Sequence, residues 1–172
     1  MGEFRPVPDV LAHLFGGWRV LRSVRDLASG AEGEFTGTTV FGPLDDGGLL
    51  HLEVGTFVWL GVPRPAERTL RFLPGPTPGT ADVRFADGRP FHDLDLTTGH
   101  WRTDHSCVAD LYRGEFEVHD EDRWRTTWRV GGPAKNQLLV TDYTRERTRQ
   151  NRPSPTGRRP AAGSSGPDGP RP

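Results

Sequence analysis

The stretch "WRTTWRV", residues 124–130, decides the fold class because its side chains alternate strictly in character. Trp124, Trp128 and Val130 share one side of this alternation, and the two arginines lie on the other. Successive side chains of a β-strand point to opposite faces, so the tryptophans are predicted to face a core and the arginines to face solvent. The segment therefore predicts one strand of a sheet that is buried on one side only.

The same period of two recurs along most of the chain, and turn-forming residues separate the repeats. The turns carry Asp-Gly, Gly-Gly or acidic clusters, as at 45–48, 87–88, 120–122 and 131–133. Successive hairpins predict an antiparallel meander, which must close or stack on itself to protect its edges. The predicted fold is all-β, a single antiparallel up-and-down β-barrel of about ten strands. The strands are expected at residues 18–26, 34–41, 49–54, 56–62, 68–73, 82–86, 90–96, 105–118, 123–130 and 136–145.

The two ends of the chain depart from this pattern. The segment "PDVLAHLFGGW", residues 8–18, predicts a short N-terminal helix that Asp9 caps and a glycine ends. From Arg147 onward the composition is reduced to mainly Arg, Pro, Gly and Ser, which offers no apolar surface to bury. We therefore predict a β-barrel domain over residues 1–146 and a disordered tail over residues 147–172.

Charge and cysteine content narrow the functional classes. The 172 residues carry a formal net charge of −1. From residue 150 onward four arginines oppose one aspartate, so that stretch is +3 and the rest is −4, which disfavours a nucleic-acid-binding body. Cys107 is the only cysteine, which excludes an intramolecular disulfide and a multi-cysteine zinc site. With neither an apolar signal core nor a membrane-length apolar stretch, the sequence predicts a cytoplasmic protein without nucleic-acid or membrane partners.

Five ordered motifs resemble a bacterial family known as domain of unknown function 6314. The motifs are "LFGGWRVLRSVRD", "FADGRPFHDLD", "HSCVADLYRGEF", "WRVGGPAK" and "VTDYTR", and the resemblance runs from about Leu11 to Arg145. Because the family is uncharacterised, the resemblance implies no reaction, substrate or cofactor.

A second resemblance concerns the architecture. A short helix, then Gly16-Gly17-Trp18, and an arginine at the end of the last strand are similar to the calycin arrangement found in lipocalins and fatty-acid-binding proteins. That resemblance implies structural closure of one barrel end by Trp18, with Arg145 packed across the indole. A guanidinium over an indole face contributes roughly 0.5–2 kcal/mol, depending on desolvation.

Three polar side chains are predicted to point into the barrel. In "VADLYRGEFEV", alternation puts Asp110 and Tyr112 on the same face as Phe116. A two-residue hairpin at 87–88 sets the register that places His92 on an apolar face. Buried polar groups persist only where a neighbouring side chain, the backbone or a ligand satisfies them. For Asp110, both an arginine or backbone partner and a ligand remain open.

We predict from these patterns a barrel that binds a small apolar or aromatic metabolite. The ligand-binding residues are expected to be His92, Asp110, Tyr112, Trp124, Trp128 and Phe116, with Phe85 as a further wall. Glu53 and Arg145 are candidates to add charge to the same lumen, although the sequence does not determine which way they face. No metal and no cofactor are expected, and oligomeric state is left open.

Several alternatives remain open at this point. His92, Asp110 and Tyr112 are the acid and base candidates of a cofactor-free enzyme, His92 is the candidate proximal ligand of a haem, and a protein-interaction module is the third possibility. His105 and Cys107 are two residues apart, which suits a metal site or a thiol and base pair. Their spacing along a strand separates them by about 6–7 Å, which favours an ordinary structural role.

Overall fold

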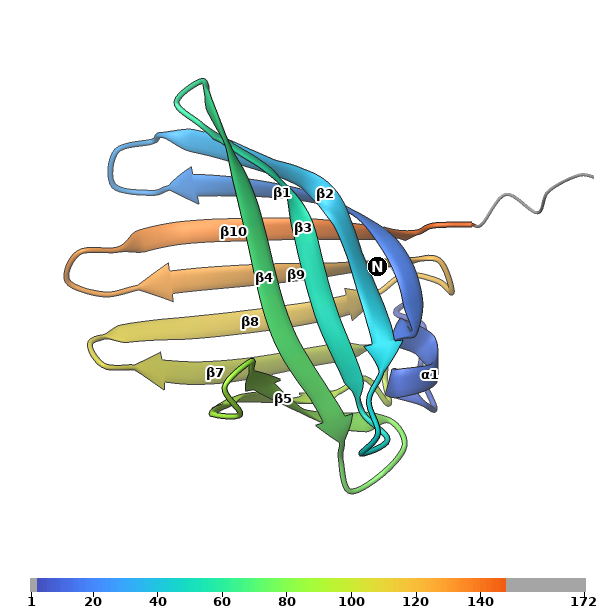
Figure 1. Ribbon diagram of the computed structural model, residues 1–172. Helices are drawn as coiled ribbons and strands as arrows, with labels where there is room; N and C mark the ends of the chain where they lie inside the picture. Colours follow the sequence, from blue (N-terminus) through green and yellow to red (C-terminus); the bar gives the residue numbers. More distant parts are fainter. Residues whose placement is uncertain (1–2, 148–172) are drawn as a thin grey trace, which may run out of the picture.

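A computed structural model describes residues 3–147 and shows ten antiparallel strands and one short helix (Figure 1). The strands follow chain order around one sheet, and β1 pairs with β10, so the chain forms a nearly closed up-and-down barrel. The prediction of an all-β barrel of ten strands is confirmed. The elements are α1 Val10–Leu14, β1 Gly16–Asp26, β2 Glu32–Pro43, β3 Leu49–Trp59, β4 Val62–Pro74, β5 Thr80–Phe85, β6 Pro90–Asp95, β7 His100–Cys107, β8 Asp110–Val118, β9 Arg123–Gly131 and β10 Asn136–Arg145.

Two of the predicted strand boundaries are wrong: one continuous strand was expected as two, and one expected strand is two strands. The strands expected at 49–54 and 56–62 begin as one strand, β3, and the turn falls at Leu60-Gly61, where both residues have positive φ. The strand expected at 105–118 is instead two strands, β7 and β8, joined by Val108-Ala109. Val108 adopts φ 54°, an unusual conformation for a β-branched residue, and the sequence carries no glycine or asparagine to signal the turn.

The predicted tail lies outside the described residues, apart from Arg147 at its start. Within residues 3–147, none of the helical segments has the length and apolar character needed to cross a membrane.

The barrel is completed by side chains at the junction of β6 and β7, the two ends of the sheet order. Thr103 Oγ1 donates a hydrogen bond to Asp93 Oδ1 over 3.1 Å. The indole Nε1 of Trp101 donates to the Asp93 carbonyl oxygen, also over 3.1 Å. These bonds join β7 to β6 where strand pairing does not.

One end of the barrel is sealed by the N-terminal segment and α1 (Figure 1). The amide nitrogens of Arg5 and Val7 donate to the carbonyl oxygens of Val118 and Leu96 over 2.8 and 3.0 Å, which straps the segment across the end. Trp18 is completely buried beneath it, and its Nε1 donates to the Leu14 carbonyl oxygen over 2.8 Å. We call this the closed end.

Aromatic side chains fill the interior next to the closed end. The rings of Trp124 and Tyr143 stack with centroids 3.7 Å apart, and Trp18 meets Trp124 edge to face at 6.0 Å. Phe41 and Phe72 continue the cluster at 5.2 Å. Because this half of the barrel is packed solid, any sizeable space must lie toward the opposite end.

Candidate functional site

The opposite end of the barrel holds a chamber of about 490 Å³, which we call the open chamber. Its volume falls within the range of small-molecule sites. The walls are mainly apolar and come from β1, β2, β3, β4 and β10; the apolar lining residues are Val24, Phe35, Phe57, Trp59, Ala66 and Leu139. The polar lining residues are Arg22, Glu53, Glu67, Arg68 and Gln137. A mostly apolar chamber with a few polar groups is the usual composition of a ligand site.

Strand alternation explains how charged residues reach this interior. In β3, Leu49, His51 and Glu53 are buried, whereas Leu52 and Val54 on the other face are 43% and 47% exposed. The phase of the strand is fixed by its register with β2 and β4. Burial here follows the register and not the polarity of each side chain.

Glu53 on β3 and Arg22 on β1 form a buried ion pair on the inner face of the barrel, with β2 between their strands. Arg22 Nη1 and Nη2 donate to Glu53 Oε1 and Oε2 over 2.8 and 2.9 Å. Arg22 Nε donates to Thr141 Oγ1 over 2.8 Å, so all three guanidinium nitrogens are engaged. Burial by itself raises the pKa of Glu53, but the hydrogen bonds from Arg22 and the charge of Arg68 hold it below its usual value. The carboxylate is therefore ionised and satisfied in the folded protein.

Arg68 lies beside this pair but is only loosely engaged. Its Nη2 is 3.7 Å from Glu53 Oε2, which is beyond hydrogen-bond distance. Its side chain is 41% exposed and lines the open chamber. Arg68 thus presents a guanidinium with spare donors to a concave, largely apolar space.

A second, much smaller cavity of about 30 Å³ lies deeper in the barrel, and we call it the deep cavity. Its size corresponds to about one water molecule. Arg68 lines it as well as the open chamber, so this side chain stands at the boundary between the two. His51 also lines it, is only 2% exposed, and has a buried Nδ1 without a hydrogen-bond partner among the described residues. Burial, followed by the charge of Arg68, lowers the pKa of His51 to about 3, so the ring is neutral.

Four of the residues predicted from the sequence line the deep cavity: His92, Phe116, Trp124 and Trp128. The ring of His92 lies 5.4 Å from that of Phe116 and 5.3 Å from that of Trp128. Its Nδ1 is 2.7 Å from the Asp93 carbonyl oxygen. Burial lowers the pKa of His92 to about 4, although Asp93 opposes this.

The structure places Asp110 and Tyr112 apart from this group. Asp110 Oδ2 pairs with Lys135 Nζ at 3.1 Å, at the rim where β8 begins. The ring of Tyr112 lies 6.1 Å from that of His105, its partner on β7. Neither residue lines the open chamber or the deep cavity.

Phe85, the further predicted wall residue, stacks on Phe91 with ring centroids 4.6 Å apart and also lines neither space.

The space around His92 does not fit a haem, the cofactor considered as an alternative. The deep cavity has room for about one water, and Phe91, Phe116 and Trp128 pack against the imidazole on several sides. Among residues 3–147 no group of three histidine, cysteine or carboxylate side chains is arranged to hold a metal ion. Cys107 is exposed.

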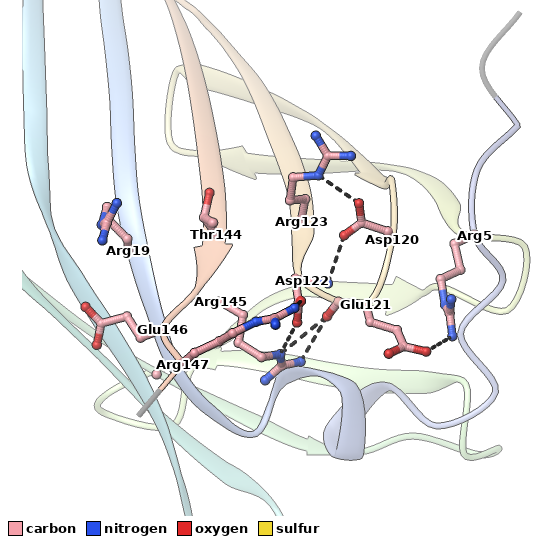
Figure 2. Close-up of a pocket in the computed structure, with 11 residues that line it drawn as sticks. Arg5, Arg19, Asp120, Glu121, Asp122, Arg123, Thr144, Arg145, Glu146 and Arg147 are labelled. Carbon is pink, nitrogen blue, oxygen red and sulfur yellow. Dashed lines mark hydrogen bonds and ion pairs between the residues drawn. The ribbon is translucent and has the colours of Figure 1, made fainter. Parts of the chain in front are cut away.

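A larger hollow of about 1000 Å³ lies outside the barrel at the closed end, and Figure 2 shows its lining. Three of its four acidic side chains are already paired, including Glu121 with Arg5 at 2.6 Å and Asp120 with Arg123 at 2.7 Å. Asp122 pairs with both Arg145 and Arg147. Because most of these charges neutralise each other on an open surface, the hollow is a weaker candidate for a ligand site than the open chamber.

The sequence analysis does not identify three polar residues that line the two spaces, namely Arg22, His51 and Arg68. Alternation from Trp18 does put Arg22 on the inner face, and alternation from Leu49 puts His51 there. A charged side chain is normally assigned to solvent, and the partner of Arg22 is 31 residues away.

The ten-stranded meander, helix-capped at one end and hollow at the other, defines a calycin-like barrel. Residues 14–145 match the family described as "Family of unknown function (DUF6314)", and the chain belongs to that family. The resemblance drawn from the sequence motifs is confirmed. A comparison with curated proteins finds no match.

Solved structures with a similar fold have little sequence in common with this chain. One is the S-type phycobiliprotein lyase CPES from Guillardia theta, with a TM-score of 0.63 and 10% identity over 84% of this chain and 94% of that chain. A Nostoc punctiforme protein of unknown function from the DUF3598 family has a TM-score of 0.59 and 13% identity, over 84% of this chain and 51% of that chain. Rv2717c from M. tuberculosis has a TM-score of 0.51 and 11% identity, over 80% of this chain and 95% of that chain. These likenesses show the fold.

Proposed function

We propose that this protein binds a small organic molecule with an apolar or aromatic body in the open chamber of its barrel. The observation that carries the proposal is the chamber itself, about 490 Å³ in volume and walled by aromatic and aliphatic side chains. Burying such surface against a ligand contributes roughly 25 cal/mol per Å² of apolar area removed from water.

The chamber wall is organised for flat apolar groups. Phe57 and Trp59, both on β3, stack with ring centroids 6.0 Å apart and an interplanar angle of 23°. Phe35 forms the adjoining wall from β2 and is held by the Arg22 guanidinium 5.2 Å from its ring centre. Rigid aromatic walls provide large contact area at low conformational cost, which suits recognition of a planar ligand.

The residues of the deep cavity form the inner part of the same lumen. His92, Phe116, Trp124 and Trp128 lie behind Arg68, and in our proposal they support the floor of the site. Asp110 and Tyr112 lie at the barrel rim, and we assign them to its entrance.

A neighbour of the same fold contributes its architecture to this proposal. The Guillardia theta protein is named as a phycobiliprotein lyase, which states an activity of that protein. At 10% identity the likeness transfers a barrel architecture, and the ligand of this chain must be argued from its own chamber.

The proposal is tested by filling the chamber. N-phenyl-1-naphthylamine is a neutral aromatic probe whose fluorescence rises in apolar sites, and we expect the purified protein to bind it. Ala66 lines the chamber from β4 and pairs with Gly55, so Ala66→Trp places an indole inside the space. We expect this variant to lose probe binding while remaining folded.

Thr36→Trp is the matched control, because Thr36 is exposed on β2 directly after Phe35. It adds the same indole to the outer surface and should bind the probe like the unmodified protein. Equal probe binding by the unmodified protein and by folded Ala66→Trp would overturn the proposal. Native mass spectrometry of the purified protein gives a second readout, since a co-purified ligand should be absent from Ala66→Trp.

A further inference from the structure

We infer that the ligand of the open chamber is an organic anion and that Arg68 binds its oxyanion head group. This inference rests on the proposed function and adds the charge of the ligand and the residue that recognises it. The relevant head groups are carboxylates, sulfonates and phosphates, which a guanidinium binds through paired hydrogen bonds.

The charged side chains that face the chamber, Arg22, Glu53 and Arg68, sum to a charge of +1. Glu53 and Arg22 neutralise each other through two hydrogen bonds, which leaves the charge of Arg68 uncompensated. Glu67, the remaining charged lining residue, is exposed and adjacent to Arg68 on β4, so strand alternation directs it to the outer face. A cationic head group would meet an unbalanced guanidinium in a partly desolvated space, which disfavours it.

Arg68 also has the unused donors that an oxyanion needs. Its guanidinium makes no hydrogen bond to any other residue within 3–147, and its contact with the Glu53 carboxylate is 3.7 Å long. By contrast, Arg22 donates from all three of its guanidinium nitrogens. Two arginines therefore face one buried carboxylate, and only one of them is satisfied by it.

His51 supplies a second observation that points to a missing polar partner. It is 2% exposed and lines the deep cavity, as Arg68 does, and its buried Nδ1 has no hydrogen-bond partner within residues 3–147. An orphaned polar atom beside a one-water cavity is satisfied by a water or by a ligand atom. A water held by His51 would extend the polar floor and bridge to an oxyanion bound at Arg68.

The test compares two probes that differ by one sulfonate. Anilinonaphthalene-8-sulfonate carries the same two aromatic groups as N-phenyl-1-naphthylamine and adds the anion. Arg68→Gln should weaken the binding of the sulfonate probe by on the order of tenfold, as expected for loss of a charged hydrogen bond. The affinity for the neutral probe should change by no more than about twofold, because the apolar walls are intact.

Arg19→Gln is the matched control. Arg19 is exposed on the outer face of β1, so its removal changes the net charge of the protein equally without altering the chamber. It should leave both affinities unchanged. Ala66→Trp should abolish binding of both probes and thereby show that each occupies the chamber.

The outcomes separate the two proposals. If the neutral probe fails to bind, or binds Ala66→Trp as well as the unmodified protein, the proposed chamber is wrong. If both probes bind in the chamber but Arg68→Gln leaves the sulfonate probe unaffected, the chamber stands and the anion inference is rejected. A circular dichroism spectrum of Arg68→Gln establishes that any loss of binding is not a loss of fold.

Discussion

The guanidinium carbon of Arg145 lies 4.1 Å from the centre of the Trp18 ring, and the two residues pair directly across β10 and β1. Arg145 Nη2 donates to the His13 carbonyl oxygen over 2.7 Å, and its Nη1 donates to that of Phe15 over 3.1 Å. One side chain thus joins the last strand, the buried indole and the end of α1. This closure limits ligand access to the other end of the barrel, where the open chamber lies.

Removing either member of this pair should destabilise the fold to different extents. Trp18→Ala deletes a fully buried indole and should cost about 3–5 kcal/mol of unfolding free energy. Arg145→Lys should be milder than Arg145→Ala, because the ammonium keeps a charge over the ring and a donor for a carbonyl. Urea unfolding of the three variants ranks their losses of unfolding free energy. Equal losses for Arg145→Lys and Arg145→Ala would show that a retained positive charge does not substitute for the stacked guanidinium.

The buried ion pair predicts an asymmetric response to mutation. Glu53→Leu leaves Arg22 and Arg68 facing each other without a counter-charge, whereas Arg22→Leu leaves Glu53 with Arg68 only 3.7 Å away. Loss of one partner of a buried pair costs about 3–5 kcal/mol, and we expect Glu53→Leu to be the more damaging change.

The double variant should recover part of that loss, because it leaves no uncompensated charge from the pair. Denaturant unfolding of the two single variants and the double variant forms a double-mutant cycle that measures the coupling. Strict additivity of the two single changes would contradict a direct interaction between Arg22 and Glu53.

Two buried histidines predict a loss of stability in mild acid. Burial lowers the pKa of His92 to about 4 and that of His51 to about 3, against an ordinary value of 6.5. Between pH 6.5 and pH 4 the histidines of the unfolded chain bind protons, whereas the buried histidines of the folded protein do not. The unfolding free energy therefore falls as the pH drops from about 6.5 toward 4. The lowered pKa of His92 alone corresponds to a loss of about 3 kcal/mol of unfolding free energy once the pH is below about 4.

Unfolding measured at several pH values in this window provides the test. His92→Gln should give a shallower pH dependence than the unmodified protein. His119→Gln alters an exposed histidine in the turn before β9 and serves as the control. A pH dependence unchanged in His92→Gln would mean that folding does not lower the pKa of His92.

Much of the fold could be predicted because its signals are local. Alternation in "WRTTWRV" correctly places Trp124 and Val130 in the interior, and both are buried in the structure. The Asp87-Gly88 turn predicts that Val83 lies opposite His92, and this pairing is observed. A bulge next to Val83 shifts the pairing nearer the turn. A proline at position 90 removes a backbone donor there and makes such an irregularity easy to accommodate.

The candidate site was less predictable because its contacts are non-local. Arg22 and Glu53 become partners only when β1, β2 and β3 are in register. Over residues 51–54 of β3, His51 and Glu53 face inward and Leu52 and Val54 face outward, which reverses the usual assignment of apolar residues to the core. Such a reversal cannot be recognised from one strand, since the register of its neighbours decides which face is inside.

Two glycines support the aromatic walls of the lumen through close contacts. Gly55 faces Gly37 across β3 and β2, and a Cβ added at Gly55 would lie 2.6 Å from Cζ of Phe35 and against the Thr36 carbonyl oxygen. Gly114 pairs with Trp128, and a Cβ added there would lie 2.6 Å from Cη2 of that indole. Phe35 lines the open chamber, whereas Trp128 lines the deep cavity.

These positions predict different effects on ligand binding. Gly55→Ala displaces Phe35 from the chamber wall and should weaken binding of N-phenyl-1-naphthylamine, and Phe35→Ala should do so without a backbone clash at Gly55. Gly114→Ala moves Trp128 in the deep cavity and should shift tryptophan emission while leaving the affinity for the probe within about twofold of the unmodified value. Gly55→Ala and Gly114→Ala should each lose about 1–3 kcal/mol of stability through overpacking, so stability alone does not separate them. If Gly114→Ala instead abolishes probe binding and Gly55→Ala has no effect, the ligand occupies the region around His92 and Trp128, and the site must be assigned there.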